Sequence, residues 1–572
     1  MNNNGLRVLL VGAAGVFGRR LAERLTVEPD ITVILAGRTR RRLDALRREL
    51  GVTAEIRLLD RESISAADLR DTGAAIVIDA AGPFRDSGSR LVEAAIDAGL
   101  HYIDLADGRA FVSNIRCYGA AAQRAGVAVI AGASSTPALS NAVLDRLVEG
   151  WTRIDTVRVA ISPGNRAPRG KSVVQSILSW AGQPVRVFRE GGWTRAPGWG
   201  TSRKMEFPGV GTRLVSLCET PDLDLLAERY QPRVAAEFLA GLELAVLHRG
   251  LALAGLAVQW GWLRSLAPFA GPARFLASLL APFGGDRGGM VVEAAGQDAS
   301  GKPVIARWSL AAAGGRGPYV PTLAALALVR RIRDGGLAFR GASPCAGLLT
   351  LEDFRRDFER LEVKTQTEFT RPPTPIFEQV LGPCFALLPP ATQAIHRPDP
   401  ALILDGTADV DGAESWTGRL MARLMGFPGQ ARGVPLRVVI EARPDGTESW
   451  SRVYPDRVMR SVMARSDPTA GTVEEHFGNI RFRLLLDANE DGLTLTPTAA
   501  WWRAVRLPLW LMPRITASER AKDDLHLFDV AITLPLVGRL VHYRGHVHLF
   551  RQRLAGDLET VLAQALMVQD AL

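Results

Sequence analysis

The chain has 572 residues, is 47% apolar and 23% charged, and carries a formal net charge of +9. This length predicts two or three globular domains, and the balanced composition without low-complexity stretches excludes a mainly disordered protein. The basic residues are interleaved with acidic ones and no helix-turn-helix, zinc-finger or RNA-binding signature is present, so nucleic acid is not an expected partner.

The chain opens with a predicted strand, turn and helix. RVLLVG (7–12) predicts the strand and RRLAERL (19–25) the amphipathic helix. A short apolar run behind Arg7 is also typical of a secretory signal, but here the helix leads straight into a second strand. Glycines in such a turn let the backbone approach a pyrophosphate, which the helix N-terminus attracts. The spacing is GxxGxxG, with Ala13 where the commoner fingerprint has glycine. We expect cofactor contacts from Gly12, Ala14, Gly15, Val16, Phe17 and Gly18.

The second predicted strand, ITVILAGR (31–38), determines the expected cofactor because it ends at Arg38. An acid at this place binds the ribose 2′-hydroxyl of NAD, whereas an arginine suits the 2′-phosphate of NADP. The alternative is an ordinary surface arginine. The placement predicts NADP.

Short apolar strands then alternate with helices, as in AEIRLLD (54–60), AAIVIDAAGPF (74–84), HYIDLAD (101–107) and VAVIAGASSTP (127–137). This alternation predicts a doubly wound parallel Rossmann sheet in a first domain, residues 1–150. Ligands bind outside the carboxyl ends of such strands. We therefore add strand-end residues to the expected cofactor site, namely Asp60, Ala81, Gly82, Pro83 and Phe84.

Polar residues after the fifth and sixth strands are the candidates for chemistry. Hydride transfer requires an oriented nicotinamide and a proton donor, and Asp107, Arg109 and Thr136 are the predicted catalytic residues. The alternative is structural: Asp104 and Asp107 would cap a turn, and residues 134–136 would begin a helix.

Several of these segments together resemble the saccharopine dehydrogenase-like, or saccharopine reductase-like, oxidoreductases. The similarity is carried by GAAGVFG, AGR, VIDAAGPF, HYIDLADG and AGASSTPALSNAV, and later by GGDRGGMVVEAAGQD and GPYVPTLAA. It covers roughly residues 6–355. The resemblance implies an NADP-binding Rossmann domain followed by an α+β substrate domain, which we place at residues 151–365. It implies no particular substrate, since the family includes amino-acid-forming reductases and reductases of lipid or polyketide-like molecules.

A third domain, residues 366–572, is predicted to be mostly antiparallel β. PLRVVIEARPDGTESWSRVY, IRFRLLLDANEDGLTL and LHLFDVAITLPLVGRLVHYRGHVHLF each suggest a strand pair. Through LPPATQAIH, WSRVY and GRLVHYRG the region resembles an uncharacterised domain fused to saccharopine dehydrogenase-like proteins, which implies no activity.

No metal site is expected. His542, His546 and His548 lack acidic residues nearby to complete a metal site, and they fit a solvent-facing strand better. The four cysteines are far apart without a CxxC pair, which also predicts no disulfide framework and favours the reducing cytoplasm.

The segment GLALAGLAVQWGWL (250–263) is apolar on all sides yet shorter than the roughly 20 residues that span a membrane. One interpretation is a core or homodimer helix. The other is an apolar substrate entrance that rests on a membrane surface. Trp260 and Trp262 would lie at the interface, and nearby arginines would contact anionic headgroups, namely Arg249, Arg264, Arg274 and Arg287. The second interpretation favours a lipid-like substrate.

The predicted function is an NADPH-dependent oxidoreductase that transfers hydride to a C=N, C=O or activated C=C bond of a small-molecule or lipid-like substrate. The expected location is the cytoplasm or the inner membrane surface. The alternative is a non-catalytic NADP-binding or lipid-binding adaptor. Substrate-dependent NADPH consumption distinguishes the two.

Overall fold

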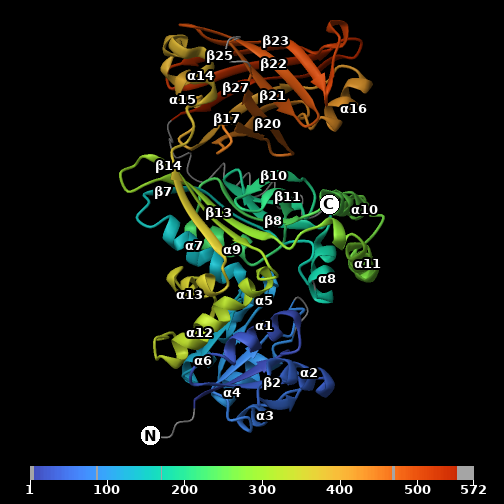
Figure 1. Cartoon of the computed structure of the whole chain (residues 1–572). Helices are drawn as coiled ribbons and strands as arrows, with labels where there is room; N and C mark the ends of the chain where they lie inside the picture. Colours follow the sequence, from blue (N-terminus) through green and yellow to red (C-terminus); the bar gives the residue numbers. More distant parts are fainter. Residues whose placement is uncertain (1–4, 85–87, 169, 467–470, 550–572) are drawn as a thin grey trace.

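The computed structural model describes residues 5–84, 88–168, 170–466 and 471–549 (Figure 1). Residues 1–4 and 550–572, the ends of the first and last predicted domains, lie outside them. Three sheets follow one another along the long axis: a parallel N-terminal sheet, a mixed middle sheet and a closed antiparallel barrel. This confirms the predicted fold class.

The N-terminal sheet has seven strands in the order β15-β6-β5-β4-β1-β2-β3, paired in parallel. Its strands are short runs of Val, Ile and Leu because helices cover both faces. The chain leaves β3 and returns at β4 on the other side of β1, so the carboxyl ends of β1 and β4 form the switch point at which such sheets bind ligands. The strands are β1 (Leu6–Val11), β2 (Ile31–Gly37), β3 (Glu55–Leu58), β4 (Ile76–Asp79), β5 (His101–Asp104), β6 (Ala128–Ala131) and β15 (Gly341–Pro344).

The helices of this domain come from two parts of the chain. Most alternate with the strands, as predicted, but the last two lie in the sequence between strands β14 and β16 of the middle sheet. They are α1 (Val16–Leu25), α2 (Arg40–Leu50), α3 (Ala66–Arg70), α4 (Arg90–Ala98), α5 (Arg109–Asn114), α6 (Gly119–Arg124), α7 (Ser140–Leu147), α12 (Leu323–Arg333) and α13 (Glu352–Arg360).

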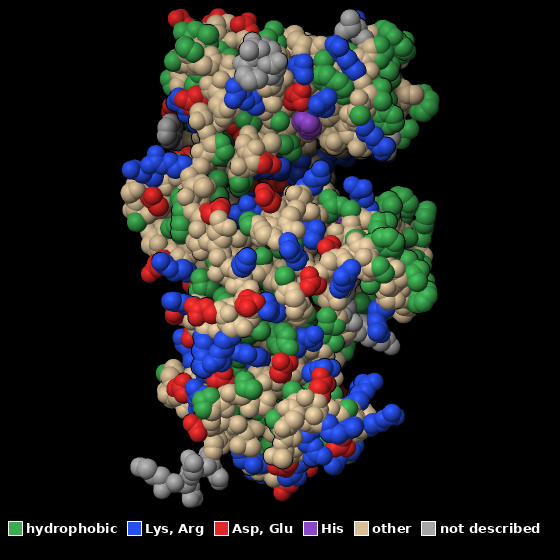
Figure 2. Space-filling view, viewed as in Figure 1, with side chains coloured by type: hydrophobic (Ala, Val, Ile, Leu, Met, Phe, Trp, Pro, Cys, Tyr) green, Lys and Arg blue, Asp and Glu red, His purple; other side chains and the backbone are tan. Residues whose placement is uncertain are grey.

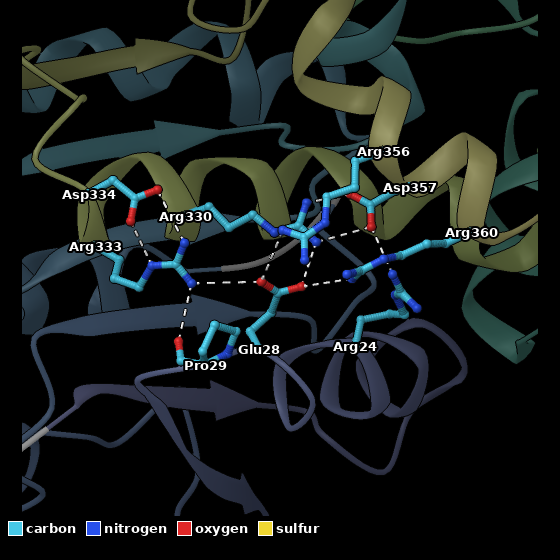
Figure 3. Close-up of polar contacts among 9 residues, drawn as sticks. All are labelled: Arg24, Glu28, Pro29, Arg330, Arg333, Asp334, Arg356, Asp357 and Arg360. Atoms are coloured by element: carbon cyan, nitrogen blue, oxygen red, sulfur yellow. Dashed lines mark hydrogen bonds and ion pairs between the residues drawn. The ribbon is translucent and has the colours of Figure 1, made fainter.

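A buried ion network fixes the returning helices to α1 (Figure 3). Arg330 of α12 donates to Glu28 at 2.6 Å and to Asp357 of α13 at 2.5 Å, and Arg24 of α1 donates to Asp357 at 2.8 Å. Burial alone would raise the pKa of Glu28, but the hydrogen bond and charge of Arg330 hold it below its ordinary value. Arg333, Arg356 and Arg360 surround the same carboxylate, at 3.5 to 3.9 Å. The network therefore stabilises a domain assembled from distant segments.

The middle sheet has nine strands, with β12 and β7 parallel and the remaining pairs antiparallel. The predicted hairpin around residues 298–302 is confirmed as β13 and β14. The strands are β7 (Arg153–Ser162), β8 (Pro184–Arg189), β9 (Gly192–Pro197), β10 (Arg203–Phe207), β11 (Gly211–Leu217), β12 (Ala235–Leu242), β13 (Gly288–Gln297), β14 (Pro303–Ala312) and β16 (Lys364–Thr370). The predicted boundary between residues 365 and 366 falls inside β16, which pairs with β14, so the passage to the barrel follows Thr370.

Four helices accompany this sheet: α8 (Lys171–Trp180), α9 (Asp222–Tyr230), α10 (Ala245–Gln259) and α11 (Ala270–Leu279). Residues 250–263 pack into the chain on one side only: Leu251 is buried, whereas Leu253, Trp260 and Trp262 are exposed, so the segment is not a buried core helix, and its role in a homodimer stays a prediction. Among the helices of the described residues, none combines the length and apolar composition needed to cross a membrane.

The barrel is an antiparallel meander that closes on itself through the pairing of its first strand, β17, with its last strand, β27. It has its own apolar core, and the predicted turn at Asp445 and Gly446 is confirmed between β18 and β19. Its strands are β17 (Ala401–Asp411), β18 (Ala431–Ala442), β19 (Glu448–Val453), β20 (Val458–Arg465), β21 (Thr472–Phe477), β22 (Ile480–Asn489), β23 (Gly492–Trp502), β24 (Val505–Arg506), β25 (Arg514–Lys522), β26 (Leu525–Leu534) and β27 (Gly538–His548). Its helices are α14 (Ile376–Leu381), α15 (Pro390–Ile395) and α16 (Trp416–Leu424).

Candidate functional site

One large cleft, with a volume of about 1930 Å³, joins the N-terminal and middle domains. One part is lined by the turns that follow β1, β2, β4, β5 and β6. The other part is lined by α8 and by residues of the middle sheet. The switch point of the parallel sheet therefore opens directly into a chamber of the second domain.

The glycine turn after β1 has the close packing that a nucleotide cradle needs. Gly12 has φ +75°, and a Cβ there would come within 2.8 Å of the backbone nitrogen of Ala81. A Cβ on Gly18 would lie 2.2 Å from the Gly12 oxygen. Gly15 caps α1 without a side-chain hydrogen bond, so the N–H groups of the first turn stay open to a ligand.

The cavity reaches most, but not all, of the predicted turn. Gly12, Ala14, Gly15, Val16 and Phe17 line the cleft. Gly18 does not: it is buried against the turn, where its lack of a side chain allows α1 to approach β1. The predicted direct contact from Gly18 is thus replaced by a packing role.

The end of β2 presents positive charge to the cleft. Arg38 and Arg42 both line it and are exposed, and neither guanidinium group forms a hydrogen bond or ion pair with another residue of the described chain. Asp60 lines the same region and accepts a hydrogen bond from the backbone of Glu62 at 3.2 Å. Unpaired guanidinium groups beside a helix N-terminus are suited to a phosphate. Sequence reasoning identified Arg38 but missed Arg42, although the basic run 38–42 contained the signal.

The predicted wall of residues 81–84 lines the cleft and is held rigid from behind. Asp79, at the end of β4, accepts hydrogen bonds from the Ala81 backbone at 2.9 Å and from Arg61 Nη1 at 3.0 Å. Arg61 also donates to the Ala81 oxygen at 2.5 Å, and its guanidinium lies 5.2 Å from the ring centre of Phe84. Asp79 and Arg61 therefore position this wall, and sequence reasoning missed both.

Asp104 has the structural role that was the alternative interpretation. Its buried carboxylate accepts hydrogen bonds from the backbone of Ala106 at 2.9 Å and of Gly132 at 2.7 Å. Burial raises the pKa of Asp104 to about 7. It joins the loops that follow β5 and β6 and so holds the neighbouring candidates in place.

Asp107 differs from Asp104 in almost every respect. Its side chain is accessible from the cleft, which it lines, and its carboxylate has no hydrogen-bond or ion-pair partner in another described residue. Asp107 is exposed toward the cleft, and desolvation by the protein around its carboxyl raises the pKa of Asp107. An unpaired acid with a raised pKa that faces a cavity is a candidate proton donor.

Arg109 lines the cleft, but its guanidinium is engaged by protein groups. Its Nε donates to Asp224 at 2.6 Å, and its Nη1 lies 3.1 Å from Glu219 and 2.9 Å from the Arg186 oxygen. These contacts connect α5 with the middle domain. Arg109 is better described as a positioning residue than as a catalytic one.

Thr136 also lines the cleft, just before α7. Its backbone has φ −130° and ψ 129°, which is extended, and Ser134 makes no side-chain capping bond to the helical turn that follows. Residues 134–136 nevertheless lie at the start of a helical segment, as the structural alternative has it, because the turn Ser135–Leu139 continues into α7. Thr136 is buried, at 8% exposure, where it lines the cleft.

The chamber in the middle domain is largely apolar. It is lined by side chains from α8 and from β7, β12, β13 and β14, among them Ile161, Trp180, Phe238, Leu242, Met290 and Leu310. Cys218 lies beside Asp107, but burial, with the charges of Glu219 and Asp107, raises the pKa of Cys218 to about 12. This thiol stays neutral and is a poor nucleophile.

Within the described residues no group of three His, Cys, Asp or Glu side chains could hold a metal ion. His542 instead lies 2.8 Å from Asp529 on the outer face of the barrel, and the rings of His546 and His548 contact each other.

Two parts of the chain match known families. Residues 8–130 match the family described as saccharopine dehydrogenase NADP binding domain, and residues 388–547 match a domain of unknown function, DUF4166. No curated protein matches the chain.

Among solved structures, saccharopine dehydrogenase (L-Glu forming) from Saccharomyces cerevisiae is 12% identical, with 64% of this chain and 100% of that chain covered and a TM-score of 0.48. Homospermidine synthase from Legionella pneumophila, in complex with NAD, is 11% identical over 64% and 91% of the two chains, with a TM-score of 0.39. Amine dehydrogenase from Mycobacterium smegmatis is 13% identical over 60% and 96%, with a TM-score of 0.35. The family matches show that the chain carries a saccharopine dehydrogenase NADP-binding domain at its N-terminus and a DUF4166 domain in its C-terminal barrel.

Proposed function

We propose that the protein is an NADPH-dependent oxidoreductase that reduces a C=N, C=O or activated C=C bond in a largely apolar, lipid-like substrate. The observation that carries this proposal is the single cleft that runs from an NADP-binding turn to an apolar chamber, with Asp107 between them. Bound NADPH supplies the hydride.

The residues of the N-terminal domain fit the cofactor. The first turn of α1 offers open N–H groups for a pyrophosphate, and Arg38 and Arg42 offer uncommitted charges for a 2′-phosphate. The Ala81–Phe84 wall, held by Asp79 and Arg61, would support the nicotinamide end.

Asp107 is the proposed proton donor. Reduction of a polar double bond consumes one hydride and one proton, and a raised pKa keeps part of this carboxyl protonated at higher pH than an ordinary aspartate. Thr136 can orient the reacting group, and Arg109 holds the loop that carries Asp107.

The chamber supports the proposed substrate class. Most of its walls are apolar and aromatic; of the charged side chains that line the cleft, Arg109 and Glu219 are paired with each other at 3.1 Å and the Arg186 guanidinium lies 4.0 Å from the ring centre of Trp193. An acyl or isoprenoid chain would gain by burying its apolar surface.

The test is NADPH oxidation with a panel of long-chain enoyl, keto and imine compounds beside keto acids with amines. Asp107→Asn should lower kcat/KM by about 10²- to 10⁴-fold while leaving NADPH affinity unchanged. Because the acid must be protonated, wild-type kcat/KM should fall as pH rises through its raised pKa, and the variant should lose that limb. Glu149→Gln, an exposed acid far from the cleft, is the control. NADPH binding without turnover on any compound would instead support the adaptor.

A further inference from the structure

The middle domain carries a large apolar surface on α10, α11 and their connections, which we call the α10–α11 surface (residues 244–285). Leu253 is 67% exposed, Trp262 73% and Phe275 69%. The exposed apolar side chains of this surface are Val246, Leu253, Trp260, Trp262, Leu263, Phe269, Phe275, Leu276, Leu279 and Phe283. Within the described residues nothing covers them, although contiguous apolar patches on soluble proteins are usually small.

The charge of this surface has one sign. Between Glu243 and Asp286 the sequence contains no acidic residue. Arg249, Arg264 and Arg274 lie on it, are exposed, and form no hydrogen bond or ion pair through their side chains with the rest of the described chain. Elsewhere in this arginine-rich protein guanidinium groups are commonly paired with carboxylates. The surface is thus apolar and cationic at once.

A second apolar area lies on the same side of the molecule. Figure 2 shows apolar side chains gathered at α10 and α11 and again on the barrel next to α16. On α16, Trp416 is 70% exposed, and Leu420 and the adjacent Leu536 are also exposed. Arg419 and Arg423 of the same helix are exposed and have no side-chain partner among the described residues. Two domains therefore present the same chemistry in one direction.

We propose that this side of the protein docks on an anionic lipid bilayer, with Trp260, Trp262 and Phe275 inserted at the interface. Apolar side chains gain free energy in the acyl region, and arginines gain from anionic headgroups. Indole rings prefer the boundary between the two environments. A flat anionic bilayer can contact the α10–α11 surface and the apolar area on α16 at the same time.

A second copy of the chain fits this surface less well. In a twofold dimer the same patch faces itself, so the arginines of one copy would meet those of the other with no acid between them. Charge complementarity therefore favours lipid over self-association.

The docked face also borders the cleft. Ser265 and Ala267, at the start of the segment that leads into α11, line it together with Ile177 and Trp180 of α8. If the proposed function holds, a lipid-like substrate would enter the chamber from the bilayer without crossing water. The docking itself does not depend on that reaction.

Flotation of the full-length protein with vesicles tests the proposal. We expect binding to phosphatidylcholine vesicles that contain phosphatidylglycerol, weak binding to phosphatidylcholine alone, and loss of binding at high salt. Replacing Arg249, Arg264 and Arg274 by Gln should lower the partition coefficient by about hundredfold. Trp260→Ser with Trp262→Ser should lower it by on the order of tenfold and reduce the quenching of tryptophan fluorescence by brominated lipid.

Leu58→Ser with Phe369→Ser is the matched control, because both side chains are 56% exposed but lie far from this surface. This variant should bind vesicles like the wild type, and all variants should keep their NADPH affinity, which separates a docking defect from failure of the proposed reaction. Absence of wild-type binding to anionic vesicles at low salt overturns the proposal. So does a dimer in sedimentation that the tryptophan variant dissociates, since the surface would then join two copies.

Discussion

Charged side chains are arranged differently in the cleft of the N-terminal domain and in the interior of the barrel. At the cleft, Arg38, Arg42 and Asp107 reach an open cavity and have no partner in the described protein. Inside the barrel, charged and polar side chains face one another instead. The first arrangement is open for a ligand, and the second is satisfied by the protein itself.

The barrel interior shows how such pairing works. Glu519 of β25 lies 2.6 Å from His396 Nε2 and 3.7 Å from His526 Nε2. Burial alone would raise the pKa of Glu519, but the charges of His396, His526 and Arg452 lower it to about 2. Arg452 in turn lies 4.0 Å from Glu475 and donates to Ser461 at 3.4 Å. Such a cluster specifies how the strands meet but offers little to a ligand.

The largest expected effect concerns the paired charges in the interior of the barrel. Glu519→Ala leaves His396 and His526 buried without their shared acid and should lower the free energy of unfolding of the barrel by about 3–5 kcal/mol. Denaturation followed by tryptophan fluorescence measures this. Asp524→Ala, which removes an exposed acid from the turn before β26, should leave the stability nearly unchanged. Weaker NADPH binding by the Glu519 variant, at denaturant concentrations where it is folded, would contradict the division of roles.

Paired charges within the N-terminal half should behave like those of the barrel. Burial alone would raise the pKa of Asp357, but the hydrogen bond and charge of Arg330 hold it below its ordinary value. The stability that this pair contributes is therefore present above the unfolded pKa of about 3.9 and is lost as pH falls through the native pKa. Asp357→Asn should lower the free energy of unfolding by about 3 kcal/mol at neutral pH. It should also make the free energy of unfolding less dependent on pH in the acid range, which denaturation at several pH values can measure. A variant with wild-type stability would show that the network in Figure 3 contributes little.

Removing an unpaired charge from the cleft should change cofactor binding but leave the stability of the protein unchanged. Arg38→Ala should reduce the preference for NADPH over NADH by about tenfold to hundredfold, because one charge-assisted contact with the 2′-phosphate is lost. Fluorescence titration with both cofactors measures the preference. Thermal stability without cofactor should not change, because Arg38 has no partner in the described protein to lose. Arg41→Ala is the control, since Arg41 is exposed but does not line the cleft. Equal affinity of the wild type for NADPH and NADH would refute the assignment.

The N-terminal half of the site could be predicted from the sequence because the motifs that mark it are adjacent in the chain. Strand, glycine turn and helix are adjacent in the chain, so Gly12, Gly15 and Arg38 could be placed from spacing alone. Strand ends likewise pointed to residues 81–84 and to Asp107. Whether a particular polar residue is paired is not local: Arg109 depends on Asp224 and Glu219, which are over a hundred residues away. The sequence therefore could not predict that Arg109 is a positioning residue and not a catalytic one.

The sequence could not predict the chamber or the edge strand β15 for a related reason. Trp180, Phe238 and Met290 meet only after the middle sheet forms, and each alone fits an ordinary core position. β15 has the sequence GASP, which carries no strand signal, and it exists because its backbone pairs with β6. The hairpins of the barrel were predictable because their turn residues and alternation are local, whereas closure through β17 and β27 joins strands at opposite ends of the domain.

The smallest expected effect concerns what the barrel contributes to the cofactor site. The barrel has its own apolar core, and it meets the middle domain through a small apolar cluster that includes Val234 and Val439 and through polar contacts such as Arg158 with Glu441 at 2.6 Å. Arg158 also pairs with Glu237 at 2.7 Å, so it keeps one acidic partner when the barrel is absent. A chain ending after Thr370 should therefore bind NADPH within about twofold of the full-length protein. A chain ending at Gln366 cuts β16, the strand that pairs along β14, and should unfold at lower temperature than the longer truncation. Titration with NADPH and thermal unfolding of both fragments test this. If the longer fragment is folded but does not bind NADPH, the barrel supports the cleft, and the contrast between an open N-terminal site and a self-contained barrel fails.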